Sequence, residues 1–295
     1  MILNVDNITK KYKDFTLNCT LSLPEGRITG IVGQNGAGKS TLFKSILNLT
    51  NTDSGSIEIF GKDPAALSHR EREQIGVVFS DSGFSGYLTV KDVTAIMKAS
   101  YENFNKEEFL SRLEHFDIPL TKKIKDFSTG MKAKLKLLLA MSYDARLLIL
   151  DEPTLGLDVV ARKELLDLLR SYMETEGRSI LISSHIASDL ETLCDDLYLI
   201  HKGRIYLHED TDVLLDQYGL LKVTKSQFES LDKTYLLSIK EETFGCECLT
   251  NQRQFYADHY PDIIIERSHI DDLLTLTILG RQLTNPQKCS HKEVL

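Results

Sequence analysis

The sequence predicts an α/β fold: a parallel sheet with interleaved helices, interrupted by a helical insert and followed by a small α+β unit. Short apolar strands alternate with helical segments between residues 147 and 201, which is typical of parallel strands joined by right-handed crossovers. A buried apolar strand at residues 27–32 runs into a glycine-rich loop and a helix. Between residues 82 and 145 helical patterns replace strand patterns, which indicates an insert within the core.

Apolar periodicity and turn residues define the elements in order. In the first third of the chain we expect strands at 2–7, 16–23, 27–32 and 56–60, turns at 10–14, 24–26 and 53–55, and a helix at 39–49. Further on we expect helices at 107–116, 130–143, 160–172 and 187–194 and strands at 147–150, 179–183 and 197–201. Beyond residue 220 the pattern predicts strands at 235–239 and 263–266 and a helix at 270–279.

These elements divide the chain into three parts. Residues 1–220 form the α/β unit with its helical insert at about 82–145, residues 221–280 form the small accessory domain, and residues 281–295 form a frayed tail.

Composition and charge exclude several classes of protein. Hydrophobic residues make up 42% and charged residues 26% of the 295 residues, which argues against a disordered or fibrous chain. The net charge of −8 argues against broad nucleic-acid binding, so no nucleic-acid partner is expected. The sequence has no run of 18 apolar residues and no signal-peptide pattern at its start, so we expect a cytosolic chain that does not span a bilayer. The five scattered cysteines predict reduced thiols rather than a zinc site.

The glycine-rich loop at residues 33–40, Gly-Gln-Asn-Gly-Ala-Gly-Lys-Ser, fits the phosphate-binding pattern G-x-x-x-x-G-K-[ST]. Glycines allow the backbone N–H groups to curl around phosphate oxygens, and the helix that follows points its positive end at the same anion. Lys39 adds a full charge near the β- and γ-phosphates, and the Ser40 hydroxyl can bind Mg²⁺. The predicted nucleotide-binding residues of this segment are Gly33, Asn35, Gly36, Ala37, Gly38, Lys39, Ser40 and Thr41.

An acid pair ends the apolar strand at residues 147–150. Ligands of parallel sheets lie at the carboxyl ends of the strands, so Asp151 would reach the Mg²⁺ ion beside the phosphate loop. Glu152 would polarise the attacking water as a general base. The alternative is a charged strand cap at the surface, which the phosphate loop makes the weaker interpretation.

The segment Phe-Ser-Thr-Gly-Met-Lys at residues 127–132 stands about twenty residues before the acid pair. With the motifs above, it resembles the signature loop of the ATP-binding subunits of ABC transporters, and the resemblance covers about residues 1–220. It implies a P-loop NTPase cassette: a RecA-like core, an N-terminal antiparallel β subdomain and a helical subdomain. In that family Ser128 and Gly130 would hold the γ-phosphate of a partner subunit, so two subunits would pair head to tail.

Three further segments are similar to the same family. Gly156-Leu157-Asp158 resembles the loop that crosses between the two sites, and His185 resembles the switch histidine that contacts the γ-phosphate. Tyr12 resembles the aromatic residue that stacks on adenine; it could also be an ordinary turn tyrosine, and Phe15 is a rival ring.

The chain departs from the family pattern at Ser80, where a glutamine normally contacts Mg²⁺ and the attacking water. Serine is too short to span this gap, so its metal contact needs a bridging water, and hydrolysis or its coupling is expected to differ. The signature segment ends in Met131 instead of glutamine, as in subunits of ABC-2-like exporters such as bacitracin- or acetoin-associated systems. The accessory segment after residue 245 resembles the appendage of such subunits.

The resemblance implies an ATPase that uses ATP and Mg²⁺ to power a membrane permease on a separate chain, with export favoured over import. Its partners would be that permease and a second ATPase subunit, identical or paralogous, and it would sit on the inner face of the membrane. Two alternatives are a soluble ABC-type ATPase acting on ribosomes or DNA and a nucleotide-gated regulatory subunit with weak hydrolysis.

Overall fold

Two β-sheets organise the chain in the computed structural model, which describes residues 1–80, 83–243 and 245–283. The first sheet contains β1 (Leu3–Lys11), β2 (Thr16–Leu23), β3 (Ile28–Val32), β4 (Ser54–Ile59), β5 (Ile75–Val78), β6 (Leu147–Asp151), β7 (Ser179–Ser184), β8 (Asp196–His201) and β9 (Arg204–Asp210). Its helices are α1 (Lys39–Ile46), α2 (His69–Arg72), α3 (Val90–Ser100), α4 (Lys106–His115), α5 (Thr129–Met141), α6 (Val159–Met173) and α7 (Ala187–Leu193). The second lobe contains α8 (Thr211–Gln217), β10 (Gly219–Val223), α9 (Lys225–Ser230), β11 (Leu236–Glu242), β12 (Gly245–Thr250), α10 (Arg253–His259), β13 (Ile264–Arg267), α11 (Ile270–Leu279) and β14 (Arg281–Gln282).

The large sheet has the order β4-β1-β2-β9-β8-β3-β7-β6-β5. Strands β8, β3, β7, β6 and β5 run parallel, whereas β4, β1 and β2 form an antiparallel group. Every residue of β6 is buried, as expected for a strand covered on both faces: Leu148 and Leu150 face one core cluster, and Leu147 and Ile149 face the other. The predicted α/β fold is therefore confirmed.

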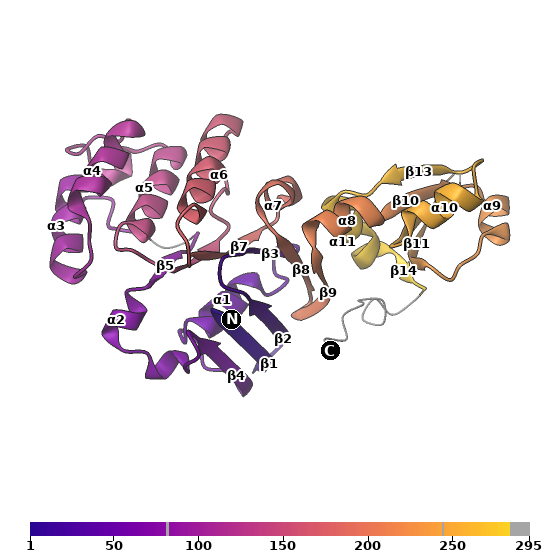
Figure 1. Ribbon diagram of the computed structural model, residues 1–295, viewed down its shortest axis with the longest axis horizontal. Helices are drawn as coiled ribbons and strands as arrows, with labels where there is room; N and C mark the ends of the chain where they lie inside the picture. The colour runs from indigo at the N-terminus through magenta and orange to yellow at the C-terminus, as the bar shows by residue number, and fades with distance from the viewer. Residues whose placement is uncertain (81–82, 244, 284–295) are drawn as a thin grey trace.

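Helices α3 to α6 stand together on one side of the sheet, and α1 lies on the other (Figure 1). Each of the insert helices has a side-chain cap: Thr89 forms a capping box with Asp92 on α3, Asn105 caps α4 and Ser128 caps α5. Helix α3 was not among the expected elements.

Several element boundaries differ from the expectations, among them the ends of β1 and α1. β1 continues to Lys11 instead of ending at residue 7, because Lys10 and Lys11 pair with Leu17 and Thr16 on β2. α1 ends at Ile46 instead of reaching residue 49, since Asn48 adopts a left-handed conformation with φ 54°.

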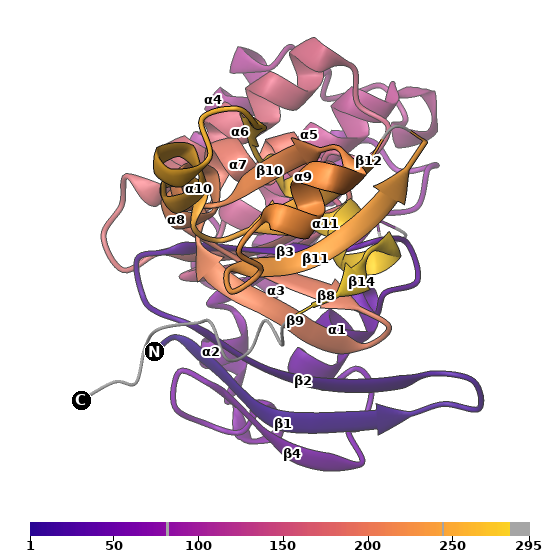
Figure 2. The same ribbon diagram turned by 90° about the vertical axis from the view of Figure 1, so that its right-hand side faces the viewer.

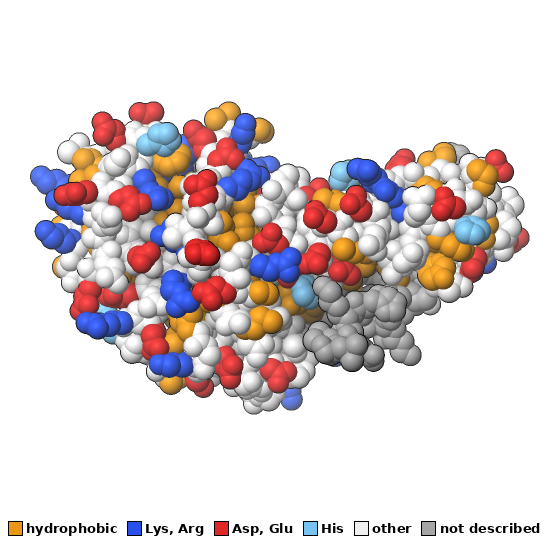
Figure 3. All heavy atoms as spheres, in the orientation of Figure 1, with side chains coloured by type: hydrophobic (Ala, Val, Ile, Leu, Met, Phe, Trp, Pro, Cys, Tyr) orange, Lys and Arg blue, Asp and Glu red, His pale blue; other side chains and the backbone are white. Residues whose placement is uncertain are grey.

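The small lobe is built on a five-stranded sheet of order β13-β10-β12-β11-β14 and lies at the β8–β9 end of the large lobe (Figures 1 and 2). It meets the large lobe where α11 begins: the Ile270 N–H donates to Glu191 Oε1 on α7 at 2.7 Å. Charged side chains of both signs spread over the face of the large lobe seen in Figure 3. The predicted frayed tail at residues 281–295 begins with an ordered segment, because Arg281 and Gln282 pair with β11 as β14. Its remainder from residue 284 onward, with Cys289, lies outside the described residues. Among the helices that the structure describes, none combines the length and apolar character needed to cross a membrane.

Candidate functional site

The phosphate loop connects the buried strand β3 to helix α1. Gly36 and Gly38 have φ values of 80° and 113°, which side chains with a Cβ rarely adopt. Gly33 is needed for a different reason, because a Cβ there would lie 2.3 Å from the Ile200 carbonyl oxygen. The loop therefore turns sharply against the sheet and presents the N-terminus of α1, with its unpaired N–H groups, to the pocket.

Lys39, the first residue of α1, is almost fully buried at the base of this loop. Its Nζ donates to the carbonyl oxygens of Gly33 at 2.6 Å and Gln34 at 3.3 Å. The same Nζ lies 3.0 Å from Glu152 Oε1. A buried ammonium group needs such partners, and here a carboxylate at the end of β6 compensates its charge.

The two acids at the end of β6 point into different surroundings. Asp151 is 2% exposed and its Oδ1 accepts a hydrogen bond of 2.6 Å from the Ser183 hydroxyl on β7. Glu152 has a φ of 53°, and its N–H donates to the Ser183 hydroxyl at 3.1 Å and the Ser183 carbonyl at 3.2 Å. These contacts turn the chain at the strand end and direct the Glu152 side chain toward the phosphate loop.

Ser183 thus contacts both acids with one hydroxyl, which donates to Asp151 and accepts from the N–H of Glu152. The sequence patterns assigned no role to this residue. Its position directly beside Asp151 depends on the register of β6 and β7, which becomes visible only in the structure.

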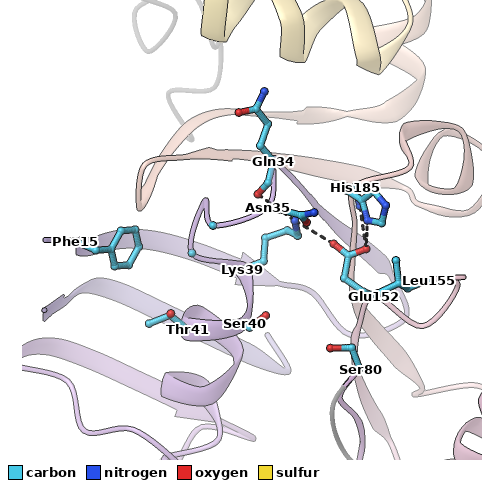
Figure 4. A pocket seen from close by; sticks show the side chains of 12 residues that line it. Phe15, Gln34, Asn35, Lys39, Ser40, Thr41, Ser80, Glu152, Leu155 and His185 are labelled. Atoms are coloured by element: carbon cyan, nitrogen blue, oxygen red, sulfur yellow. Dashed lines mark hydrogen bonds and ion pairs between the residues drawn. The ribbon is translucent and has the colours of Figure 1, made fainter.

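His185 follows β7 and contacts the second oxygen of Glu152. Its Nδ1 lies 2.5 Å from Glu152 Oε2, and its backbone N–H donates to the same oxygen at 3.2 Å. Figure 4 shows Lys39 and Glu152 pointing toward each other across the opening, with His185 beside Glu152. The carboxylate is therefore held on one side by the loop lysine and on the other by the histidine.

Most of the predicted site residues meet in one pocket (Figure 4). Its lining comprises Phe15, Gln34, Asn35, Gly36, Gly38, Lys39, Ser40, Thr41, Ser80, Glu152, Leu155 and His185. Asp151 directly precedes Glu152 in the chain, and Gly33 and Ala37 belong to the phosphate loop. Six predicted residues are not part of this lining as the structure describes it. Gly33, Ala37 and Asp151 adjoin lining residues in the chain, whereas Tyr12, Ser128 and Gly130 do not.

Tyr12 stands on the turn between β1 and β2 and is 48% exposed, whereas Phe15, the rival aromatic residue, lines the pocket. The Tyr12 N–H donates to the Phe15 carbonyl oxygen at 2.7 Å, which closes the turn and leaves the two rings 6.3 Å apart. The Phe15 ring of this pair lies against the phosphate loop, because a Cβ at Gly38 would lie 2.9 Å from it.

Ser128 and Gly130 lie at the start of α5, away from the pocket of their own subunit. The Ser128 hydroxyl accepts from the Met131 N–H at 3.2 Å and caps the N-terminus of the helix. Asp158 has the corresponding position on α6, where it accepts from the Ala161 N–H at 2.9 Å.

Comparison with known proteins identifies the family. The profile of the ABC transporter family matches residues 17–155. Among characterised relatives, the lantibiotic transport ATP-binding protein of Streptococcus pyogenes is 34% identical over 72% of this chain and 92% of the relative. The bacitracin transport ATP-binding protein of Enterococcus faecalis is 31% identical over 69% of this chain and 68% of the relative. The Nod factor export ATP-binding protein of Rhizobium etli is 32% identical over 83% of this chain and 82% of the relative.

A solved structure described as the ATP-binding subunit of an ABC transporter superposes with a TM-score of 0.66 at 28% identity, covering 74% of this chain and 93% of its own. Sequence profile, relatives and fold agree with the resemblance inferred from the motifs. The chain belongs to the family of ATP-binding subunits of ABC transporters.

Proposed function

We propose that this subunit hydrolyses ATP to ADP and phosphate, and that hydrolysis powers export through a membrane permease encoded on a separate chain. One observation carries the proposal. In the pocket next to the phosphate loop, the carboxylate of Glu152 lies 3.0 Å from Lys39 Nζ and 2.5 Å from His185 Nδ1. A base, a phosphate-binding cation and a histidine thus surround the place where a γ-phosphate would bind.

The loop residues bind the triphosphate. Backbone N–H groups of Gly36, Gly38 and Lys39 face the anion, and Asn35, Ser40 and Thr41 line the same opening. An incoming phosphate competes with Glu152 for Lys39, because both are anions that need the same buried ammonium group. Nucleotide binding would therefore release Glu152 from the lysine.

The residues around the pocket fit a Mg²⁺ ion bound mainly through the nucleotide. Ser40 and Asp151 supply oxygen donors of the kind that Mg²⁺ prefers, and Ser80 adds a hydroxyl on the opposite wall. Within the described part of the chain no group of three or more His, Cys, Asp or Glu side chains could hold a metal. The ion would take its other ligands from phosphates and water. When bound, the ion neutralises charge on the transferred phosphoryl group.

Glu152 accepts a proton from the attacking water as that water approaches the γ-phosphate. His185 holds the second carboxylate oxygen, so the carboxylate keeps one orientation. Since its ring lies at the same edge of the pocket, His185 can also donate to the γ-phosphate and respond to its loss. Most of the rate enhancement comes from this positioning and charge compensation.

The aromatic pair on the β1–β2 turn binds the base. Tyr12 offers an exposed ring for stacking on adenine, and Phe15 places its ring against the loop at the pocket wall. Both residues are therefore part of the proposed nucleotide site.

Ser128 and Gly130 act on the nucleotide of a second ATPase subunit. Their position at a helix N-terminus outside the pocket of their own subunit supports a head-to-tail pair. The exposed apolar residues Leu155, Val159 and Val160 lie around the adjacent loop at residues 156–158, where a partner would cover them.

The permease places the subunit on the inner face of the cell membrane. The named relatives serve lantibiotic transport, bacitracin transport and Nod factor export. The segment around Phe84 and Tyr87, exposed next to Ser80, is the surface proposed for permease contact.

Purification of the tagged subunit from native membranes in mild detergent, followed by mass spectrometry, tests the transport assignment. A multi-span membrane protein in stoichiometric amount is expected. Recovery with ribosomes or DNA and without a membrane protein would contradict it and favour the soluble ATPase alternative. Absence of Mg²⁺-dependent phosphate release from the purified complex would instead favour a regulatory subunit.

A further inference from the structure

The Ser80 wall of the pocket is attached to helix α5 by one lysine. Lys136, in the middle of α5, donates from Nζ to the carbonyl oxygen of Phe79 at 3.3 Å and to that of Ser80 at 3.2 Å. Its side-chain stem also lies next to Gly83, since a Cβ at Gly83 would lie 3.3 Å from Lys136 Cε. The lysine therefore holds the backbone where the chain leaves β5 and enters the insert.

A second contact joins the same two elements. A Cβ at Gly76 on β5 would lie 2.5 Å from the Ala140 carbonyl oxygen on α5, so strand and helix approach closely enough to exclude a side chain. Ala140 is one turn beyond Lys136. The backbone that leads to Ser80 is thus packed on α5 at Gly76 and hydrogen-bonded to it at Phe79 and Ser80.

The identity of the contact residue matters for the pocket. A lysine is a donor with no acceptor capacity, so it can satisfy two backbone carbonyls at once and keep them turned away from the phosphates. Ser80 has a short side chain, and its hydroxyl reaches a ligand only if its backbone is correctly placed. Positioning of this segment therefore has a larger effect here than it would with a long side chain.

We propose that Lys136 is a positioning residue: it fixes Ser80 at the pocket wall and links that wall to the N-terminus of α5. In a subunit pair, Ser128 and Gly130 at the N-terminus of α5 hold the phosphate of the partner's nucleotide. Through Lys136 the same helix holds Ser80, so this phosphate changes the hydrolysis rate in the subunit's own pocket. The two sites of a subunit pair would communicate through α5 within each chain. The inference rests on the proposed hydrolysis and pairing.

The test uses the full chain and measures ATP hydrolysis against ATP concentration. Because two charge-assisted hydrogen bonds to the wall are lost, Lys136→Met is expected to lower kcat about tenfold, with KM and the affinity for a fluorescent ATP analogue changed by less than about twofold. The Hill coefficient is expected to exceed 1 in the wild type and to fall to 1 in Lys136→Met. Lys136→Arg, which keeps the donor, is expected to restore most of kcat and the cooperativity.

Lys134→Met is the matched control. Lys134 lies two residues away on α5 and pairs with Glu164 on α6 at 2.5 Å, so its loss removes a lysine from the helix and leaves the Ser80 contact intact. Its kcat and Hill coefficient should equal those of the wild type. A further test is the double variant Lys136→Met/Ser80→Ala, expected to be no slower than the slower single variant, because both changes act on the same wall.

Several outcomes would overturn the proposal. These are an unchanged kcat and Hill coefficient in Lys136→Met, a wild-type Hill coefficient of 1, additive losses in the double variant, or an equal loss in Lys134→Met. Weakened ATP binding together with a lowered Tm would show a purely structural contact; if Lys136→Met does not fold, Lys136→Gln is judged by the same criteria. A wild-type chain without hydrolysis would instead contradict the proposed function, so the two failures are distinguishable.

Discussion

The Ser183 hydroxyl offers a sharp test of how the acid pair is held. Ser183→Ala removes the 2.6 Å hydrogen bond to Asp151 and the 3.1 Å contact with the Glu152 N–H, and the methyl group fits where the buried serine was. The Glu152 N–H keeps its bond to the Ser183 carbonyl, so the main loss is the bond to the Asp151 carboxylate.

A hydrogen bond to a charged group contributes about 1.5–3 kcal/mol. If this energy serves to hold Asp151 in the geometry that the metal needs, its loss lowers kcat/KM by about 10- to 150-fold. We also expect half-maximal activity to require more Mg²⁺, because the carboxylate is no longer fixed. The assay is steady-state phosphate release across a Mg²⁺ titration, with nucleotide binding measured in parallel.

Ser179→Ala is the control for this experiment. Ser179 is equally buried on the same strand, but its hydroxyl contacts Gly26 N–H and the Pro24 carbonyl at the opposite end. It should lose about 1 kcal/mol of stability and no activity. Equal kcat/KM and Mg²⁺ dependence in the two variants would refute the role assigned to Ser183.

Two further predictions concern stability and pH. Gly76→Ala should lower the free energy of unfolding by about 1–3 kcal/mol or more, measured by urea denaturation, because its Cβ would meet the Ala140 carbonyl at 2.5 Å. Gly61→Ala is the control, because φ is +73° there and no atom lies within 4 Å of the added Cβ, so that it tests backbone strain without a clash. Equal losses of unfolding free energy in the two variants would contradict the packing argument. The hydrogen bond from Lys62, with those from the Ser68 N–H and hydroxyl, lowers the pKa of Glu71 from 4.5 to about 2. The stabilisation of the α2 cap is therefore fully present above pH 4.5 and lost as the pH falls toward 2. An NMR titration of Glu71 should show this midpoint and its rise in Lys62→Met; a wild-type midpoint above pH 4 would contradict it.

Local sequence patterns predicted the parts of the site that lie within single segments. The phosphate loop needs glycines and a lysine at fixed spacing, and the acid pair needs a buried strand that ends in carboxylates, so residues 33–41 and 151–152 could be placed at the ends of β3 and β6. The strands of the parallel sheet were equally clear, because their continuous apolar runs reflect burial on both faces.

Contacts between distant segments could not be predicted in the same way. Ser183 and Asp151 are 32 residues apart in the sequence, and Lys136 and Ser80 are 56 residues apart. In both pairs the residue types do not indicate which residue will be the partner. The order β13-β10-β12-β11-β14 likewise depends on pairing between strands whose local patterns are alike. Helix α3 has Asp92 in its capping box and a mixed sequence, and its burial against the insert helices appears only in the packed structure.

The most direct test of the central claim compares Mg²⁺-dependent phosphate release by the wild-type chain with that of Glu152→Gln. This change keeps the size of the side chain and removes the base. We predict that the variant binds ATP, accumulates as an ATP-bound dimer in size-exclusion chromatography, and hydrolyses at least about 100-fold more slowly than the wild type. Wild-type turnover in Glu152→Gln would contradict the assignment of Glu152 as the base.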